Sequence, residues 1–168
     1  MESTVIFGEV DTWVSYLIKV KKIVVFGAGR ERLQVMGLAM RLFHLGLTAS
    51  VVSDMNTPAV GKGDVFLTAC GPGELSTVTA LAKVAREAGA AVAMGTAQPD
   101  GVSIQDADFV MTIPAQTMAD DHTTSSVLPM GSLFEGALFI LFEVVVIRLK
   151  DKISISADVM RSNHTNLE

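Results

Sequence analysis

The chain has 168 residues, of which 49% are hydrophobic and 18% are charged. This composition excludes an intrinsically disordered protein, which needs low hydrophobicity and a high net charge. The net charge of −5 offers no electrostatic footprint to a nucleic acid, and the single cysteine excludes both an intrachain disulfide framework and a multi-cysteine zinc site.

The apolar residues are numerous enough to supply contacts between subunits as well as a core, so we expect a homo-oligomer. The N-terminal residues lack a basic start followed by an unbroken apolar run, so we expect no export segment and a cytoplasmic location. The most apolar stretch, 133–149, is interrupted by Glu135 and Glu143 and falls short of the ~20 apolar residues of a membrane helix. We therefore expect a buried helix there and no membrane partner.

Five short apolar runs alternate with longer helical patterns along the chain. The runs predict strands at 22–26, 48–53, 65–69, 90–94 and 109–113. The helical patterns predict helices at 31–45, 74–88, 103–107, 130–150 and 156–160, with a short helical segment at 1–20 and a C-terminal tail at 151–168. This alternation predicts an α/β fold, a doubly wound five-stranded parallel sheet sandwiched by helices, in a single domain over 1–168.

The turn after the first predicted strand contains Gly27, Gly29 and Arg30. Glycines allow the backbone to approach an anion, and the helix that follows offers unpaired N–H groups. A dinucleotide-binding fingerprint needs a third glycine where Arg32 stands, although Asp54 is placed like a ribose-binding acid. A nicotinamide site and a simple strand-to-helix turn both remain open.

A second glycine-rich turn follows the third predicted strand and opens a helix, which is the design of an anion cradle. A capped turn without a ligand accounts for the same pattern. The candidate ligand contacts here are Cys70, Gly71, Gly73, Glu74, Ser76 and Thr77. No His or Lys lies near Cys70 in sequence, which favours a buried structural thiol over a nucleophile.

Glu135 stands near the start of the long apolar helix. A carboxylate there is either a charge that suits the helix dipole or a partly desolvated base with a raised pKa. His164 lies in the terminal tail, where chain ends are normally frayed. His122 lies in a polar loop without a defined third ligand, so we expect no metal.

Several motifs together resemble one family, from about Lys22 to Glu168. They are VVFGAGR, GLAMRLFHLG, TPAVGKGD, GPGE, LPMGSLFE at 128–135 and HTNLE at 164–168. The chain resembles the sugar isomerase (SIS) domain and, within it, the 6-phospho-3-hexuloisomerase family. The resemblance implies a five-stranded parallel sheet, usually a tetramer, and interconversion of 3-hexulose 6-phosphate and fructose 6-phosphate through an enediol, without a metal or organic cofactor.

The resemblance also implies roles for individual residues. Glu135 matches the glutamate of the family's GSLFE element, where the base is expected, and Arg30 matches the arginine of GAGRS. His164 matches a terminal histidine that is placed to reach a neighbouring subunit's site as a second acid/base or ring-opening group.

The chain departs from the family in its anion cradle. Glu31 stands where members have serine, and Cys70, Pro72 and Leu75 replace hydroxyl residues of the S-G-S-G-E-T run. Glu31 places a negative charge near the expected anion, while the missing hydroxyls leave compensation to other donors. The candidates are Ser76, Thr77, Thr123, Thr124 and Ser125.

Two alternatives to the isomerase therefore remain. A diverged SIS domain that senses a sugar derivative without catalysis is favoured by the altered cradle. A nicotinamide-dependent enzyme is favoured only by the glycine turn and Asp54.

Overall fold

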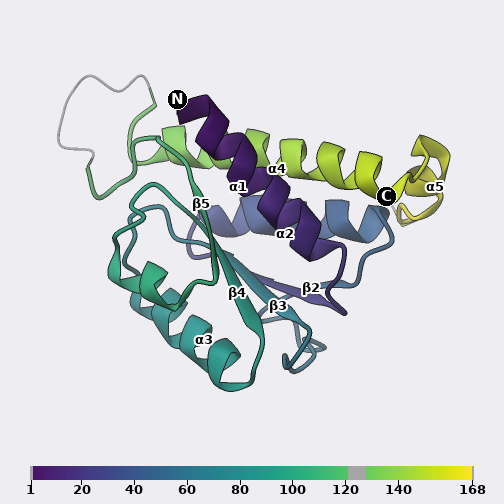
Figure 1. The fold of residues 1–168 in the computed structure, drawn as a ribbon, viewed down its shortest axis with the longest axis horizontal. Coiled ribbons are helices and arrows are strands. Elements are labelled where there is room, and N and C mark those ends of the chain that lie inside the picture. Colours follow the sequence, from purple (N-terminus) through teal and green to yellow (C-terminus); the bar gives the residue numbers. More distant parts are fainter. Residues whose placement is uncertain (1, 121–127, 168) are drawn as a thin grey trace.

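The computed structural model describes residues 2–120 and 128–167, with side chains from Gly8 onward. It contains a five-stranded parallel sheet in the order β2-β1-β3-β4-β5 (Figure 1). The strands are β1 (Ile23–Phe26), β2 (Ala49–Val51), β3 (Val65–Ala69), β4 (Ala91–Thr96) and β5 (Phe109–Thr112). The predicted fold class is confirmed, because β-branched and apolar runs buried on both faces form parallel strands.

Helices cover both faces of this sheet (Figure 1). One face carries α1 (Glu2–Leu17), α2 (Glu31–His44) and α4 (Ser132–Ile153), and the other carries α3 (Ser76–Glu87) with the 3₁₀ helix η1 (Val102–Asp106). A last short helix, α5 (Ala157–Ser162), follows the end of α4. None of the helices in the described part of the chain is long and apolar enough to cross a membrane.

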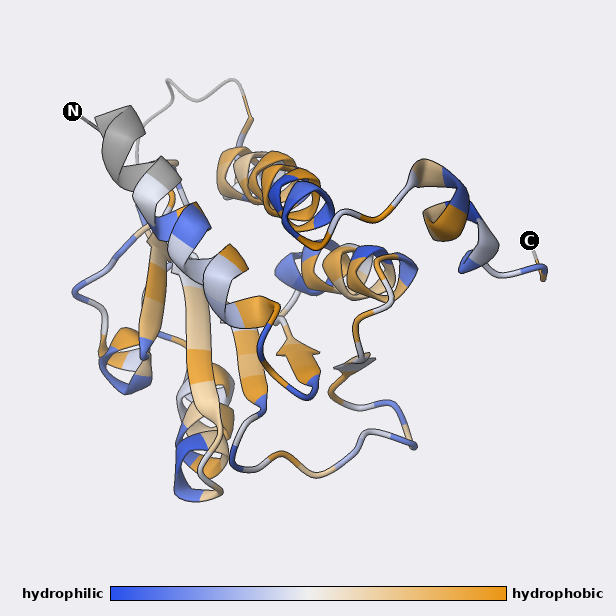
Figure 2. Cartoon of the chain, turned by 45° about the vertical axis from the view of Figure 1, so that its right-hand side comes forward, coloured by the Kyte–Doolittle hydropathy of each residue, from blue (hydrophilic) through white to orange (hydrophobic). Residues whose placement is uncertain are grey.

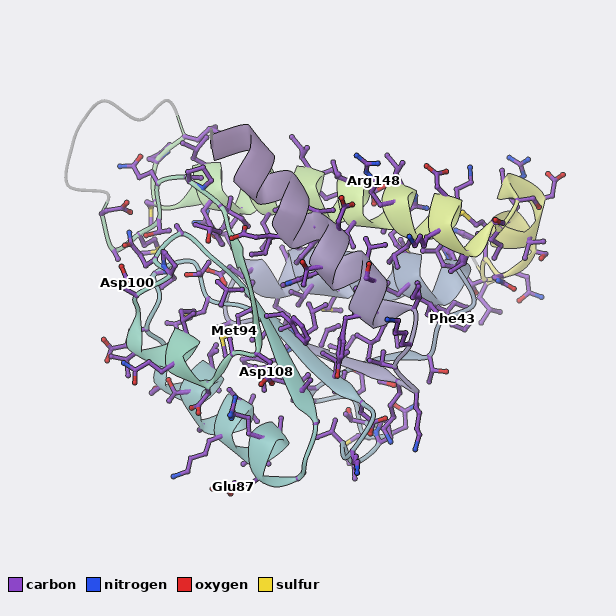
Figure 3. The ribbon with its side chains drawn as sticks, in the orientation of Figure 1. Phe43, Glu87, Met94, Asp100, Asp108 and Arg148 are labelled. Atoms are coloured by element: carbon purple, nitrogen blue, oxygen red, sulfur yellow. The ribbon has the colours of Figure 1, made fainter. Side chains whose placement is uncertain are left out.

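The sheet separates two hydrophobic clusters. The larger lies beneath α1, α2 and α4 and includes Trp13 and Phe134, each almost fully buried. The smaller lies beneath α3 and includes Met94, which projects from the sheet toward that helix (Figure 3). Figure 2 shows the strands as predominantly hydrophobic, as expected of a sheet covered on both faces.

The start of α3 differs from the sequence-based expectation. The helix begins at Ser76 rather than at residue 74, because Leu75 is extended and its N–H donates to Ser103 Oγ at 2.9 Å. The long helix α4 likewise starts at Ser132, since Met130 and Gly131 have φ angles of 59° and 77° and cannot belong to a right-handed helix. It extends to Ile153, into the predicted tail.

The strand order changes direction between β1 and β3, which are neighbours in the sheet. The chain runs from β1 outward to β2, then returns to β3 on the other side of β1 and continues to β4 and β5. The connections that leave β1 and β3 at their carboxyl ends therefore diverge to opposite faces. In doubly wound sheets this point is where ligands bind.

Candidate active site

A cavity of about 440 Å³ opens beside the carboxyl ends of β1 and β3. Most of its wall is apolar, and four of its side chains are polar: Arg30, Glu31, Thr117 and Glu135. The remaining lining comes from Ala28, Gly29, Pro72, Leu75, Met118, Gly131 and Phe134. An apolar cavity with a few convergent polar groups is the usual form of a small-molecule site.

The turn from β1 into α2 positions Arg30 and Glu31. A Cβ on Gly27 would lie 2.7 Å from the backbone of Arg32, so only glycine allows the strand end to touch the first turn of α2. Gly29 adopts a φ of 54°. This tight turn places Arg30 and Glu31 in the wall of the cavity, where Arg30 is exposed and Glu31 is buried.

The start of α4 positions Glu135. Gly131 has a positive φ and packs tightly, because a Cβ there would lie 3.0 Å from the Met118 nitrogen. The N–H of Phe134 donates to the Gln116 carbonyl at 3.2 Å, which ties the helix to the segment after β5. Glu135 then falls in the first turn of α4 and lines the cavity.

Arg30, at the end of the β1–α2 turn, contacts the start of α4. Its Nε lies 3.1 Å from Glu135 Oε2, its Nη1 donates to Ser132 Oγ at 3.0 Å, and its Nη2 donates to the Met130 carbonyl. The glutamate is largely shielded from solvent and the arginine is about half exposed. One of these contacts holds the Glu135 carboxylate, and the other two hold the start of the helix that carries it.

In the predicted anion cradle after β3, several backbone N–H groups donate hydrogen bonds to other groups of the chain. The N–H of Gly71 donates to Glu31 Oε1 at 3.0 Å, that of Gly73 to the Cys70 carbonyl, and that of Leu75 to Ser103 Oγ. Pro72 has no N–H to donate. Backbone donors of this turn are thus engaged within the chain, which the sequence pattern did not reveal.

The other predicted contacts of this turn lie away from the cavity wall. Cys70 is fully buried in the cluster beneath α3 and does not line the cavity. Burial raises the pKa of its thiol to about 11, so the thiol is neutral. Gly73 packs against Gly101 and Gln98, while Glu74, Ser76 and Thr77 are exposed near the start of α3. The structure therefore places Cys70 in the cluster beneath α3 and not in the lining of this cavity.

His164 lies at the other end of the molecule from Glu135. Its ring stacks 5.0 Å from that of His44, at the C-terminal end of α2. His164 shares a cavity lining with Val146, Ile147 and Lys150 of α4, which lie about 17–23 Å along the helix axis from Glu135. One chain therefore does not bring the two predicted catalytic residues together.

Some predicted residues are outside this picture. Thr123, Thr124, Ser125 and His122 lie outside the described residues. Within the described ranges, no cluster of His, Cys, Asp and Glu is arranged to hold a metal ion. Asp54 is exposed after β2 and does not line the cavity.

The doubly wound sheet, with a cavity that holds four polar side chains at its switch point, defines an α/β protein with a candidate small-molecule site. Residues 16–140 match the SIS domain, and the chain belongs to that family. It is 40% identical over 152 residues to a 3-hexulose-6-phosphate isomerase of Mycobacterium gastri, covering 90% of this chain and 76% of the relative. A 3-hexulose-6-phosphate isomerase of Bacillus subtilis is 30% identical over 161 residues, covering 95% and 87%.

Solved structures agree with this assignment. A Methanococcus jannaschii protein, whose crystal structure led to an inferred function of 3-hexulose-6-phosphate isomerase, superposes with a TM-score of 0.86 at 27% identity, covering 96% of this chain and 86% of that one. An Escherichia coli protein solved in complex with a ligand has the same fold at 17% identity, with a TM-score of 0.78 and coverage of 94% and 85%. The family resemblance of the sequence motifs is confirmed.

Proposed function

We propose that this protein is a phosphosugar isomerase that interconverts 3-hexulose 6-phosphate and fructose 6-phosphate. The observation that carries the proposal is the Glu135 carboxylate, held by Arg30 in the wall of the switch-point cavity. The relatives named above support the choice of sugar.

The reaction moves a carbonyl between two adjacent carbons of the sugar. A base removes the proton from C2 of the 3-hexulose, the C3 carbonyl oxygen takes up a proton, and an enediol forms. Return of a proton to C3 and loss of the C2 hydroxyl proton give the 2-ketose. A single positioned carboxylate serves both carbons, and general-base catalysis of this kind contributes about 10²–10⁴-fold in rate. We assign that role to Glu135.

We assign the second acid/base role to His164 of another copy of the chain. Within one chain, His164 lies beside Val146 and Lys150, about three to four turns of α4 away from Glu135. The pairing therefore needs an oligomer, and the family resemblance favours a tetramer.

The sequence-based expectation of a cytoplasmic location stays a prediction, which a fluorescent fusion would test.

An apolar face on α2 and α4 supports this assembly. Exposed apolar side chains follow one another at helical spacing on both helices, which are joined by the Arg41–Glu143 ion pair at 3.0 Å. Phe43, at the end of this face, projects outward from α2 (Figure 3). The face is formed by Leu33, Met36, Met40, Phe43, Leu133, Phe139, Ile140 and Ile147.

Carbon-13 NMR of fructose 6-phosphate incubated with the protein tests the function directly. We expect a second set of resonances with the carbonyl at C3, growing to an equilibrium mixture. The competing sensor function is favoured by Glu31, which puts a further carboxyl in the cavity. Binding of fructose 6-phosphate with no new resonances would favour the sensor and contradict the isomerase.

A further inference from the structure

Glu31 is a buried carboxyl whose second oxygen has no partner. The residue is 8% exposed, and its Oε1 accepts the Gly71 N–H at 3.0 Å. Its Oε2 is buried and finds no hydrogen-bond partner among the described residues, although Glu31 lines the cavity. Buried polar atoms are almost always hydrogen-bonded, so an orphaned carboxyl oxygen on a residue of the cavity wall points to a missing partner.

The carboxyl is held firmly in this position. A Cβ added to Gly71 would lie 2.8 Å from Glu31 Oε1 and 2.8 Å from the ring of Phe134. The carboxyl and the ring therefore pack directly against the glycine. A donated N–H fixes Oε1 as the acceptor oxygen. If the group carries a proton, that proton is therefore on Oε2, the oxygen without a partner.

The burial of Glu31 and the charges around it favour its neutral form. Burial, the largest effect, raises the pKa of Glu31 to about 7, the Gly71 N–H opposes the shift, and Glu135 on α4 adds to it. The guanidinium of Arg30, the cation in the cavity wall, is engaged by Glu135 and Ser132.

Other titratable groups lie on the elements packed around this site. The β3–α3 segment contributes the neutral thiol of Cys70 and the exposed carboxylate of Glu74. The segment after β5 contributes Asp120, which accepts two hydrogen bonds from Thr117, and Arg32 follows Glu31 on α2. An anion that enters the cavity adds a further negative charge and favours the protonated carboxyl more strongly.

We propose that Glu31 is a ligand-binding residue that acts as a neutral carboxylic acid, with Oε2–H donating a hydrogen bond to a phosphate oxygen of the bound sugar phosphate. This inference rests on the proposed function. The acid supplies one O–H donor, and hydrogen bonds to charged acceptors are the strong ones. Phosphate binding is then accompanied by uptake of a proton.

Titration calorimetry with fructose 6-phosphate tests the proposal between about pH 7.5 and about pH 9, where the phosphate (second pKa about 6) stays a dianion. We expect the affinity of the wild-type protein to fall about tenfold per pH unit, because each unit makes protonation of Glu31 costlier. The apparent binding enthalpy should also differ between two buffers of different ionisation enthalpy, in proportion to the protons taken up.

The variant Glu31→Gln is the matched control, because its amide keeps the shape, donates a hydrogen bond and has no proton to gain. We expect its affinity to stay constant over this pH range and to exceed that of the wild type at pH 9. Its melting temperature at pH 8 should be higher than that of the wild type. The folded wild-type protein loses stability as pH rises through the folded-state pKa of Glu31, because the buried carboxyl then becomes charged. Glu31→Ser, which keeps an O–H donor that does not titrate in this range, provides a second variant with the same expected loss of pH dependence.

The outcomes separate this inference from the function on which it rests. Wild-type binding that is independent of pH and buffer, or an equal pH slope in Glu31→Gln, would overturn the role of Glu31 and leave the isomerase intact. Absence of binding by the wild type and by both variants at every pH would overturn the phosphosugar function itself. Proton uptake on binding free fructose as well would show that Glu31 contacts a sugar oxygen, which contradicts the phosphate contact.

Discussion

Arg30 and Glu135 form the best-defined interaction in the cavity. Glu135 was identified from the sequence as a candidate base, and Arg30 as a ligand contact, but their pairing joins two segments more than 100 residues apart in the chain. The sequence carries no local signal for such a contact. The guanidinium acts here on the position of Glu135, Ser132 and Met130, so we treat Arg30 as a positioning residue.

Replacement of Arg30 by lysine tests this positioning role. A lysine keeps the charge but cannot make three directed contacts at once, because its ammonium is a point donor on a flexible stem. We expect kcat to fall by about tenfold or more, because a misplaced catalytic group lowers the rate of the chemical step. The change in KM should be smaller. Stability should change by less than about 1 kcal/mol, since Arg30 is about half exposed. Unchanged kcat in Arg30→Lys would contradict the role.

At the scale of secondary structure, periodicity predicted the strands and helices well. Buried parallel strands and long helices leave strong local patterns, and all five strands were placed within a few residues of their observed bounds. The turns were predicted less well, because their backbone contacts come from distant segments. Gly71 donates to Glu31, and Leu75 donates to Ser103, and neither partner is adjacent in sequence.

Gly71→Ala tests how tightly the turn after β3 packs on α2 and α4. The new Cβ would lie 2.8 Å from the Phe134 ring, and overpacking of this kind costs about 1–3 kcal/mol. Thermal or denaturant unfolding measures the change. Gly8→Ala on α1 is the matched control, because nothing lies within 4 Å of its Cβ, and alanine should stabilise this helix by up to about 1 kcal/mol. Equal effects of the two substitutions would contradict the packing.

At the scale of the whole molecule, the apolar face of α2 and α4 calls for a partner surface. Ile140 is 65% exposed on this face, so a charge there should disturb the proposed assembly more than the fold. We expect Ile140→Glu to sediment as a smaller species than the wild type. Val84→Glu, at a comparably exposed site on α3, should leave the assembly unchanged. A wild type that sediments as a monomer at micromolar concentration would refute the assembly.

The separation of His164 from Glu135 leads to a complementation experiment. Glu135→Gln and His164→Ala should each be inactive alone. Mixed oligomers, formed by unfolding and refolding the two variants together, should regain part of the wild-type activity, because some sites then combine an intact Glu135 with an intact His164 from another chain. No recovery in mixtures shown to contain both chains would refute a shared site.

Exchange of hydrogen into fructose 6-phosphate in deuterated water tests the central claim most directly. If Glu135 is the base, the wild-type protein should replace the C3 proton of the sugar with deuterium, as followed by proton NMR. Glu135→Gln keeps the shape of the side chain and removes the base, so exchange should slow by about 10²–10⁴-fold while the thermal shift caused by fructose 6-phosphate persists. Exchange at the wild-type rate in Glu135→Gln, or no exchange in a wild type that binds the sugar, would contradict the account.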